Sequence, residues 1–206
     1  MIARFLFVMI FSFFALSAQA QGVFPARYDV QGVASDDVLN LRAGPGADTE
    51  IVGSLAPDAT SVEILGLNDT GTWALVAQPE LTAWASTSFL DRQPGQDQFQ
   101  PLSQMPLRCI GTEPFWSVTL DTPGIATLDT PEQEAEDIDL SNYATSANDL
   151  RVQSFNGIGS VGPILGVIRR AYCSDGMSDR DYGFTLDFFS DTTGQISHLT
   201  GCCRLN

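Results

Sequence analysis

Apolar and polar residues alternate in short stretches between residues 28 and 91, which is the period of a half-buried β-strand. Turn-forming residues such as Gly44-Pro45-Gly46 separate these stretches. The pattern predicts strands at residues 38–42, 51–55, 62–65, 73–76 and 83–86, with residues 89–90 closing the segment. Strands this short and this close together predict a small, tightly curved barrel.

Residues 107–206 repeat the alternating pattern. The predicted strands are residues 115–120, 125–128, 150–155, 164–173, 184–189 and 196–204. We expect the acidic residues 132–139 to form a solvated loop and Asn156-Gly157 to form a turn, because Asn-Gly is a strong turn signal. The sequence therefore predicts a second antiparallel β domain, either a barrel or a highly curved sheet, and an all-β fold class.

Residues 92–106 are rich in proline and glutamine and show no sustained period. This composition is typical of an extended connector between domains. The sequence thus divides into a first domain over residues 28–91 and a second over residues 107–206.

The chain begins with the features of a signal peptide, which we assign to residues 1–20. Arg4 precedes an apolar run over residues 5–16, and Ala18-Gln19-Ala20 is a small-x-small cleavage site. A membrane anchor is the alternative, but the run is shorter than the ~20 residues that span a bilayer. No cysteine stands at the cleavage point of a lipoprotein. We expect a periplasmic or secreted protein with no stable membrane span after cleavage.

The four cysteines are Cys109, Cys173, Cys202 and Cys203. An even number of cysteines in an exported chain favours disulfide bonds. A bridge between the adjacent Cys202 and Cys203 would be strained, so we expect Cys109 and Cys173 each to take one of them. Which takes which stays open. A thiolate metal site is the alternative, but the chain has no C-x-x-C pair.

The charge is strongly acidic, with a formal net charge of −15 and no lysine. Such a chain repels nucleic acid and anionic lipid, so we expect no nucleic-acid partner. Residues 157–162 fit G-x-G-x-x-G, but Pro163 and a strand-like run follow in place of a helix. We therefore expect a flexible loop there, and no cofactor.

Several motifs in residues 39–90 match those of a known family. Residues 39–45 read L-N-L-R-A-G-P, residues 55–59 (L-A-P-D-A) are similar to an L-x-x-G-x turn, and Trp73-x-x-Val76 and Trp84-Ala85-x-x-x-x-Leu90 follow. The segment resembles the bacterial SH3-like domain. Two positions depart from the pattern, because Asp58 and Ala83 stand where the family prefers glycine.

The resemblance implies a recognition module of the cell envelope that binds a cell-wall peptide or a protein partner. Leu39 and Leu41 would point into the barrel, while Asn40 and Arg42 would point outward beside the Gly-Pro-Gly turn. Trp73 and Trp84 would form an aromatic binding face, or else lie in the core, where an indole often anchors a small barrel.

The second domain carries three motifs that resemble a family of uncharacterised bacterial envelope proteins. They are C-x-G-x-E-P-F-W from Cys109, C-x-D-G-M-S-D from Cys173 and the ending Gly201-Cys202. The resemblance implies a small β-rich fold and brings no activity with it.

The polar stretch over residues 173–182 organises the second domain, because its charges must be exposed or paired. Glu113 beside Trp116 is either a buried general acid or the ion-pair partner of Arg180. Asp175, Asp179 and Asp181 lack the spacing of a calcium loop. Hydrogen bonds that form turns are their expected use, and we predict no metal.

No complete catalytic set is present in the sequence, and the lone His198 has no evident nucleophile. We therefore predict a non-enzymatic envelope-binding protein. Its tentative ligand-binding residues are Trp73, Trp84, Glu113, Trp116, Asp175, Asp179 and Arg180. One alternative is a cell-wall hydrolase that uses Glu113 and an aspartate of residues 175–181. Another is an inhibitor or sensor module that binds an envelope protein, which an exposed apolar patch would favour.

Overall fold

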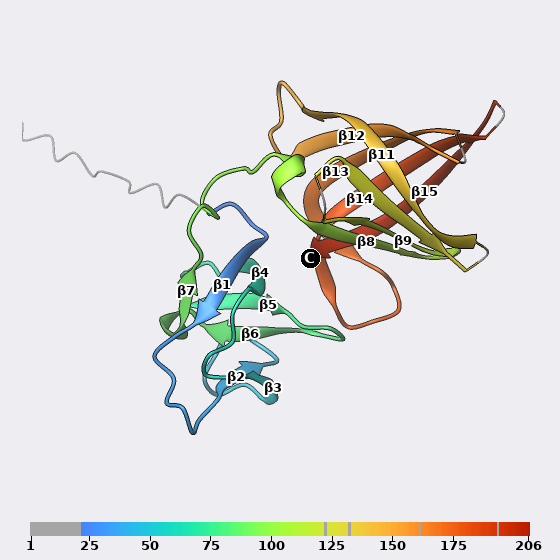
Figure 1. The fold of residues 1–206 in the computed structure, drawn as a ribbon. Helices are drawn as coiled ribbons and strands as arrows, with labels where there is room; N and C mark the ends of the chain where they lie inside the picture. Colours follow the sequence, from blue (N-terminus) through green and yellow to red (C-terminus); the bar gives the residue numbers. More distant parts are fainter. Residues whose placement is uncertain (1–21, 122, 132, 161, 193) are drawn as a thin grey trace, which may run out of the picture.

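The protein consists of two β bodies, an open seven-stranded sheet and a closed eight-stranded barrel (Figure 1). The structure is a computed structural model that describes residues 22–121, 123–131, 133–160, 162–192 and 194–206. The predicted all-β fold class is confirmed, and the second domain is a barrel. The segment assigned to a signal peptide lies outside the described residues.

The first sheet has the strand order β3-β2-β6-β5-β4-β1-β7. Its strands are β1 (Ala26–Val30), β2 (Leu39–Arg42), β3 (Ile51–Leu55), β4 (Val62–Leu67), β5 (Trp73–Ala77), β6 (Thr82–Ser86) and β7 (Leu90–Arg92). A 3₁₀-helix, η1 (Thr87–Phe89), connects β6 to β7. Strand β1 was not predicted, and it pairs with β4 on one side and β7 on the other.

Alternation along the strands builds the core of this sheet, as the sequence predicted for Leu39 and Leu41, which are buried. Arg42, which follows Leu41, points outward, and its Nη1 donates a hydrogen bond to the Thr49 carbonyl at 2.6 Å. The Thr49 hydroxyl donates in turn to the carbonyls of Gly44 at 2.9 Å and Gly46 at 2.8 Å. These bonds hold the Gly-Pro-Gly turn in place.

The barrel closes in the order β10-β11-β12-β13-β14-β15-β8-β9. Its strands are β8 (Leu107–Thr112), β9 (Phe115–Leu120), β10 (Ile125–Thr130), β11 (Gln133–Thr145), β12 (Val152–Gly159), β13 (Gly162–Ser174), β14 (Asp181–Thr192) and β15 (Gln195–Leu205). The interior is filled by large apolar side chains, of which Phe155, Phe184 and Phe188 are almost fully buried.

Three local predictions for this domain are wrong. The described part of the acidic stretch belongs to β11 rather than to a loop, with Ile138 buried and Asp137 and Asp139 exposed. Asn156-Gly157 lies inside β12, where hydrogen bonds from β11 and β13 on both sides outweigh its turn preference. The flexible loop expected over residues 157–162 is wrong for the described residues, because residues 157–159 belong to β12 and Gly162 to β13, which pair with each other.

Two disulfides link the strands of the barrel, Cys109–Cys203 and Cys173–Cys202. Cys109 and Cys203 are directly opposite in β8 and β15 and fully buried. Cys202 points to the other face of β15, and its bond to Cys173 crosses over β14. Adjacent cysteines thus serve two faces of one strand.

The connector packs against the barrel instead of extending freely. The 3₁₀-helix η2 (Leu102–Gln104) places Leu102 in the barrel core, together with Met105. The amide side chain of Gln153 holds this segment, because it accepts a hydrogen bond from the Leu102 N–H and donates one to the Gln100 carbonyl. The connector therefore belongs structurally to the second body.

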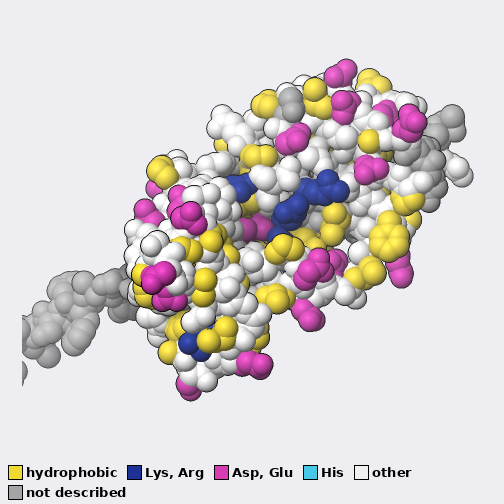
Figure 2. All heavy atoms as spheres, turned by 60° about the horizontal axis from the view of Figure 1, so that its bottom comes forward, with side chains coloured by type: hydrophobic (Ala, Val, Ile, Leu, Met, Phe, Trp, Pro, Cys, Tyr) yellow, Lys and Arg dark blue, Asp and Glu magenta, His cyan; other side chains and the backbone are white. Residues whose placement is uncertain are grey.

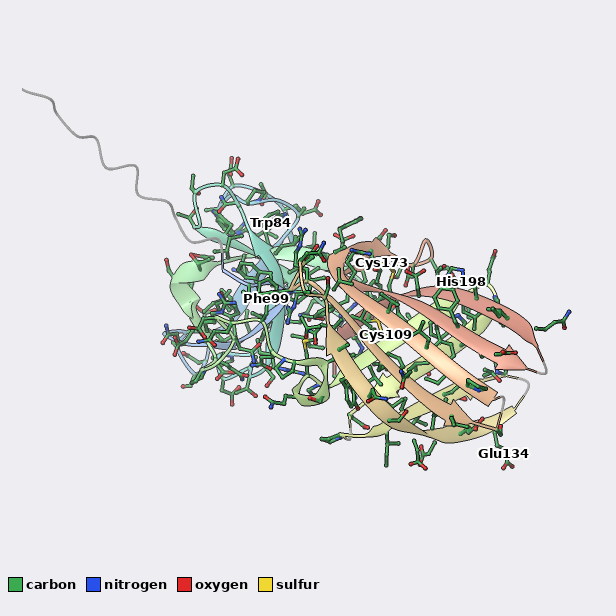
Figure 3. The ribbon with its side chains drawn as sticks, turned by 90° about the horizontal axis from the view of Figure 1, so that it is seen from above. Trp84, Phe99, Cys109, Glu134, Cys173 and His198 are labelled. Carbon is green, nitrogen blue, oxygen red and sulfur yellow. A yellow bond between two sulfur atoms is a disulfide. The ribbon has the colours of Figure 1, made fainter. Side chains whose placement is uncertain are left out.

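The polar stretch between β13 and β14 docks the barrel onto the first sheet. Cys173 lies at the end of the barrel nearest that sheet, whereas His198 and Glu134 lie farther along it (Figure 3). The Asp179 carbonyl accepts a hydrogen bond from the Thr82 N–H at 3.0 Å, and Leu81 forms an isolated β-bridge with Asp179. Gly183 permits close packing, since a Cβ there would lie 1.9 Å from Pro25 Cγ.

Candidate functional site

The predicted aromatic residues of the first domain lie outside its core, on the outer face of the sheet. Trp73 and Trp84 are half-buried, while their neighbours Ala74 and Ala85 are fully buried. Trp84 is directly opposite both Leu75 of β5 and Arg42 of β2. The two indoles therefore occupy diagonal positions on one face of adjacent strands, where aromatic side chains are within reach of each other.

A groove of about 560 Å³ runs along this outer face. Trp73, Asn40 and Arg42 line it, together with Val38 and Phe89, which are 45% and 38% exposed. Trp84 lies beside the groove rather than in its wall. The groove thus offers an aromatic and aliphatic wall next to one guanidinium, a combination suited to holding an extended peptide.

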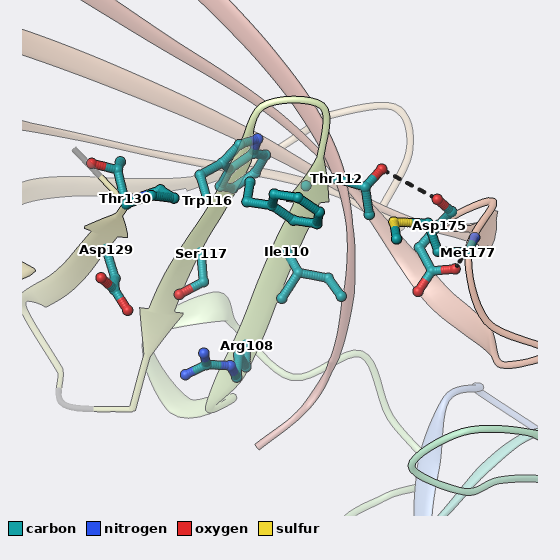
Figure 4. Close-up of a pocket in the computed structure, with 12 residues that line it drawn as sticks. Arg108, Ile110, Thr112, Trp116, Ser117, Asp129, Thr130, Asp175 and Met177 are labelled. Carbon is teal, nitrogen blue, oxygen red and sulfur yellow. Dashed lines mark hydrogen bonds between the residues drawn. The ribbon is translucent and has the colours of Figure 1, made fainter.

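A second pocket, of about 530 Å³, lies on the outside of β8, β9 and β10 (Figure 4). Trp116 forms part of its wall, although the side chain is only 5% exposed and its ring stacks on Phe188 inside the barrel. Two motif glycines make room for this indole. A Cβ on Gly111 would lie 2.0 Å from Trp116 Nε1, and one on Gly201 would lie 2.8 Å from Trp116 Cζ2.

Arg180 does not pair with Glu113, so that expectation is wrong. Glu113 is exposed in the turn between β8 and β9, before a cis peptide bond to Pro114. Arg180 is buried and forms an ion pair at 2.8 Å with Glu63 of the first sheet. Its guanidinium also donates to the Gln78 carbonyl. The arginine of the polar stretch therefore joins the two domains.

Glu63 is the residue that receives this contact, and both of its oxygens are occupied. Oε2 accepts from Arg180, and Oε1 accepts from the Leu205 N–H at 2.9 Å. Burial of the carboxylate raises the pKa of Glu63, against the opposing effects of the Leu205 N–H and the Arg180 charge. The sequence offered no signal for this partner, because Glu63 and Arg180 are 117 positions apart.

The three aspartates of the polar stretch serve separate structural purposes. Asp175 Oδ1 accepts from the N–H groups of Met177 at 3.0 Å and Ser178 at 2.9 Å. Asp179 is exposed and contacts the first domain through its backbone. Asp181 Oδ1 accepts from the Tyr172 hydroxyl at 2.9 Å. Among the described residues, no group of three His, Cys, Asp or Glu side chains could hold a metal ion.

The electrostatics of Asp175 follow from these bonds. Partial burial raises the pKa of this carboxyl, but hydrogen bonds from Ser178, Met177 and the Tyr182 hydroxyl lower it by more, so the net shift is downward. The pKa of Tyr182 is raised, first by burial of its own side chain and second by its hydrogen bond to the Asp175 carboxylate. Asp175 also reaches the pocket of Trp116, where the Thr112 hydroxyl donates to its carbonyl at 3.3 Å.

Two further observations bear on the chain as a whole. Within the described ranges, we find no helix with the length and apolar character needed to cross a bilayer. No curated protein and no solved structure matches the chain. The resemblance of residues 107–206 to uncharacterised envelope proteins stays a prediction.

A family model matches the region that holds the groove of Trp73. The family model described as "Bacterial SH3 domain" matches residues 37–91, a span that runs from just before β2 into β7. Residues 37–91 of this chain are therefore similar to a bacterial SH3 domain.

Proposed function

We propose that this is an exported, non-enzymatic binding protein of the cell envelope, whose SH3 domain holds a cell-wall peptide or a protein partner. The observation that carries the proposal is the groove of Trp73, which lies within the matched residues and combines exposed apolar side chains with Arg42. Domains of this family are modules that bind peptidoglycan or protein, and the groove is the part of this one that fits an extended chain.

The compartment is supported by the covalent structure. All four cysteines form disulfides, which persist in oxidising surroundings outside the cytosol. The apolar segment before Ala18-Gln19-Ala20 supports export by a signal peptide. Both observations fit a periplasmic or secreted protein.

Binding is favoured over hydrolysis by the state of the carboxylates. A glycosidase needs two carboxyl groups that face the same sugar ring across roughly 5 to 9.5 Å. Here the Asp175 carboxylate is engaged in its own turn, Asp181 accepts from Tyr172, and Asp179 lies at the domain junction. Glu113 does not line either of the two pockets that Asp175 lines, so the structure offers no shared cleft for that pair.

An inhibitor or sensor module is the second candidate, and one observation favours it. The outer face of the barrel exposes Ile158 by 71%, Leu165 by 41% and Ile196 by 75%. Apolar surface of this kind marks contact sites for other proteins. If the barrel binds an envelope protein there, Ile158→Ser with Ile196→Ser abolishes capture of that protein, whereas Trp73→Ala leaves it unchanged.

Co-sedimentation with purified cell wall tests the leading proposal. We expect the wild type to sediment with the wall and Trp73→Ala to lose at least tenfold in affinity, since buried aromatic anchors dominate such contacts. Trp84→Ala is expected to have a smaller effect because it lies beside the groove. Leu67→Ala removes an apolar side chain that is 41% exposed elsewhere on the sheet and serves as the control.

The proposal fails if the wall is bound equally well by the wild type and Trp73→Ala. It also fails if Leu67→Ala weakens binding as much as Trp73→Ala does. Should the wild type not bind the wall, the same variants are to be compared against envelope proteins captured by cross-linking, and indifference to Trp73→Ala there would reject the groove altogether.

A further inference from the structure

Two arginines face each other on the outside of the barrel. Arg108 of β8 and Arg204 of β15 are direct partners in the antiparallel register. Both are half-buried and point outward, because their neighbours Leu107, Cys109, Cys203 and Leu205 point into the core. Directly opposed residues of adjacent strands have Cβ atoms about 4.5–5.5 Å apart.

Neither arginine forms an ion pair with a carboxylate of the described residues. In the described part of the chain, the ion pairs join Arg151 to Asp149, Arg180 to Glu63 and His198 to Asp187. Arg108 makes one hydrogen bond, to the Thr119 hydroxyl at 3.4 Å. The charge of Arg204 acts on Glu63, but both oxygens of that carboxylate are already occupied.

This arrangement is unusual for a chain of net charge −15 with 25 acidic residues. Like charges directly opposite on a sheet are destabilising, and carboxylates are abundant elsewhere in this chain. Figure 2 shows basic side chains gathered in the middle of one face, between the two domains, with acidic side chains scattered over the rest of that face. Because Arg108 and Arg204 form no ion pair within the described residues, their guanidiniums can take an anionic ligand.

Arg108 stands at one end of the pocket of Trp116, and Arg204 is its direct neighbour on β15. Arg108 belongs to the pocket wall, and Figure 4 shows it below Ser117, on the side away from the indole. From Arg108 to Thr112 the pocket of Trp116 follows β8 for four residues, or about 14 Å. An extended peptide of about four residues has this length.

The rest of the wall narrows the choice of ligand. Ile110, Phe115 and Met177 supply apolar surface, and Phe115 and Met177 are 57% and 67% exposed. Asp129, which is exposed and opposite Ser117, lies in the same wall. A polyanion would be repelled by Asp129. A ligand with a single carboxylate and apolar side chains can place the carboxylate at Arg108 and the apolar side chains along the rest of the pocket wall.

We propose that the barrel binds the C-terminal end of a peptide here, with the terminal carboxylate held by Arg108 and Arg204 and the preceding apolar side chains packed along Ile110, Phe115 and Met177. Guanidinium groups bind carboxylates through paired, charge-assisted hydrogen bonds. The site belongs to the second domain, so it is independent of the SH3 groove and of the function proposed for it.

The probe is an acetylated tetrapeptide of leucine and alanine with a free C-terminal carboxylate, titrated into the full chain by calorimetry. We expect binding by the wild type, about tenfold weaker binding of the C-terminal amide, and a similar loss for Arg108→Gln and for Arg204→Gln. Arg169→Gln removes an exposed arginine on the outer face of β13 and should leave the affinity unchanged.

Thermal unfolding without peptide provides the second readout. If the pair exists for a ligand, Arg108→Gln removes repulsion and the melting temperature stays the same or rises. The proposal is overturned if the wild type binds no peptide acid, if acid and amide bind equally, or if Arg169→Gln matches Arg108→Gln. It is also overturned if an amidated peptide with an internal glutamate binds as tightly, or if Arg108→Gln melts several degrees lower.

Discussion

Asp175 illustrates how much local structure one carboxylate can organise. It begins the turn that follows β13, its carboxylate accepts hydrogen bonds from two successive N–H groups and from the Tyr182 hydroxyl, and its carbonyl accepts one from the Thr112 hydroxyl. A charged acceptor makes these bonds stronger than a neutral one would. The aspartate of the C-x-D-G-M-S-D motif is therefore a fastener of the turn.

This role predicts a pH dependence. The folded-state pKa of Asp175 lies below its ordinary value of 3.8, so the unfolded chain takes up the proton first as the pH falls. The stability that this residue contributes is present above pH 3.8 and is lost below it. We expect Asp175→Asn to be less stable than the wild type at pH 7 and to lose less on going to pH 3, measured by urea unfolding.

Asp69→Asn is the matched control, because Asp69 is an exposed carboxylate in the β4–β5 loop. It should follow the wild type at both pH values. An identical loss in Asp175→Asn and wild type between pH 7 and pH 3 would contradict the role assigned to Asp175.

Strand β15 shows what an element can do with two adjacent cysteines. Successive side chains on a strand point to opposite faces, so Cys203 closes the barrel internally to β8 while Cys202 fastens the end of β13 from outside. The doubled cysteine is therefore a consequence of strand geometry. The two disulfides tie the segments that carry Cys109 and Cys173 to the last strand of the barrel.

The two disulfides should differ in strength. Cys109–Cys203 closes 94 residues of chain and Cys173–Cys202 closes 29. By loop-closure entropy the first is worth about 1 kcal/mol more, and either costs about 2–5 kcal/mol to remove. We expect Cys109→Ala with Cys203→Ala to lower the free energy of unfolding by more than Cys173→Ala with Cys202→Ala does, measured in urea. The reverse order would show that Cys173–Cys202 contributes more to the stability of the barrel than Cys109–Cys203 does.

The sequence predicts where most strands lie, but it does not predict how pairing with neighbouring strands overrides a local turn preference. Residues 73–76 and 83–86 were recognised from alternation alone, because one face of each strand is buried. Asn156-Gly157 was misjudged, because a turn preference is local and the ladders to β11 and β13 are not. Gly157 serves close packing there, since a Cβ would lie 2.4 Å from the Asp139 carbonyl.

At the scale of the whole molecule, the two domains are joined by a buried polar contact. Glu63 meets Arg180 and the Leu205 N–H, while Thr82 meets Asp179 and Asp181. Arg170 of β13 adds a further contact, since it lies over Phe99 of the connector and over Phe184, with its guanidinium bonded to the Pro25 carbonyl. These contacts make the SH3 domain and the barrel a single docked unit.

The buried pair predicts strong coupling between its members. Removing one partner leaves the other charged and desolvated, so Glu63→Gln and Arg180→Met should each cost about 3–5 kcal/mol of unfolding free energy. The double variant should cost less than the sum of the two, measured by urea unfolding. Each single variant should also expose the connector to protease, because docking is weakened.

Arg42→Met serves as the control, since this half-buried arginine lies within the first sheet and bonds only its own turn. It should leave the connector protected. Additive losses of under about 1 kcal/mol for Glu63→Gln and Arg180→Met would show that the pair is not what holds the domains together.

By itself, the sequence determined the all-β class, the SH3 segment and the disulfide framework, because alternation, turn residues and cysteine count are local properties of the chain. Only the tertiary structure decided that Arg180 meets Glu63, that Trp73 and Trp84 face outward, and that Arg108 lies opposite Arg204. Those relations depend on strand register and domain docking, which bring together residues far apart in the sequence, and no local pattern records them.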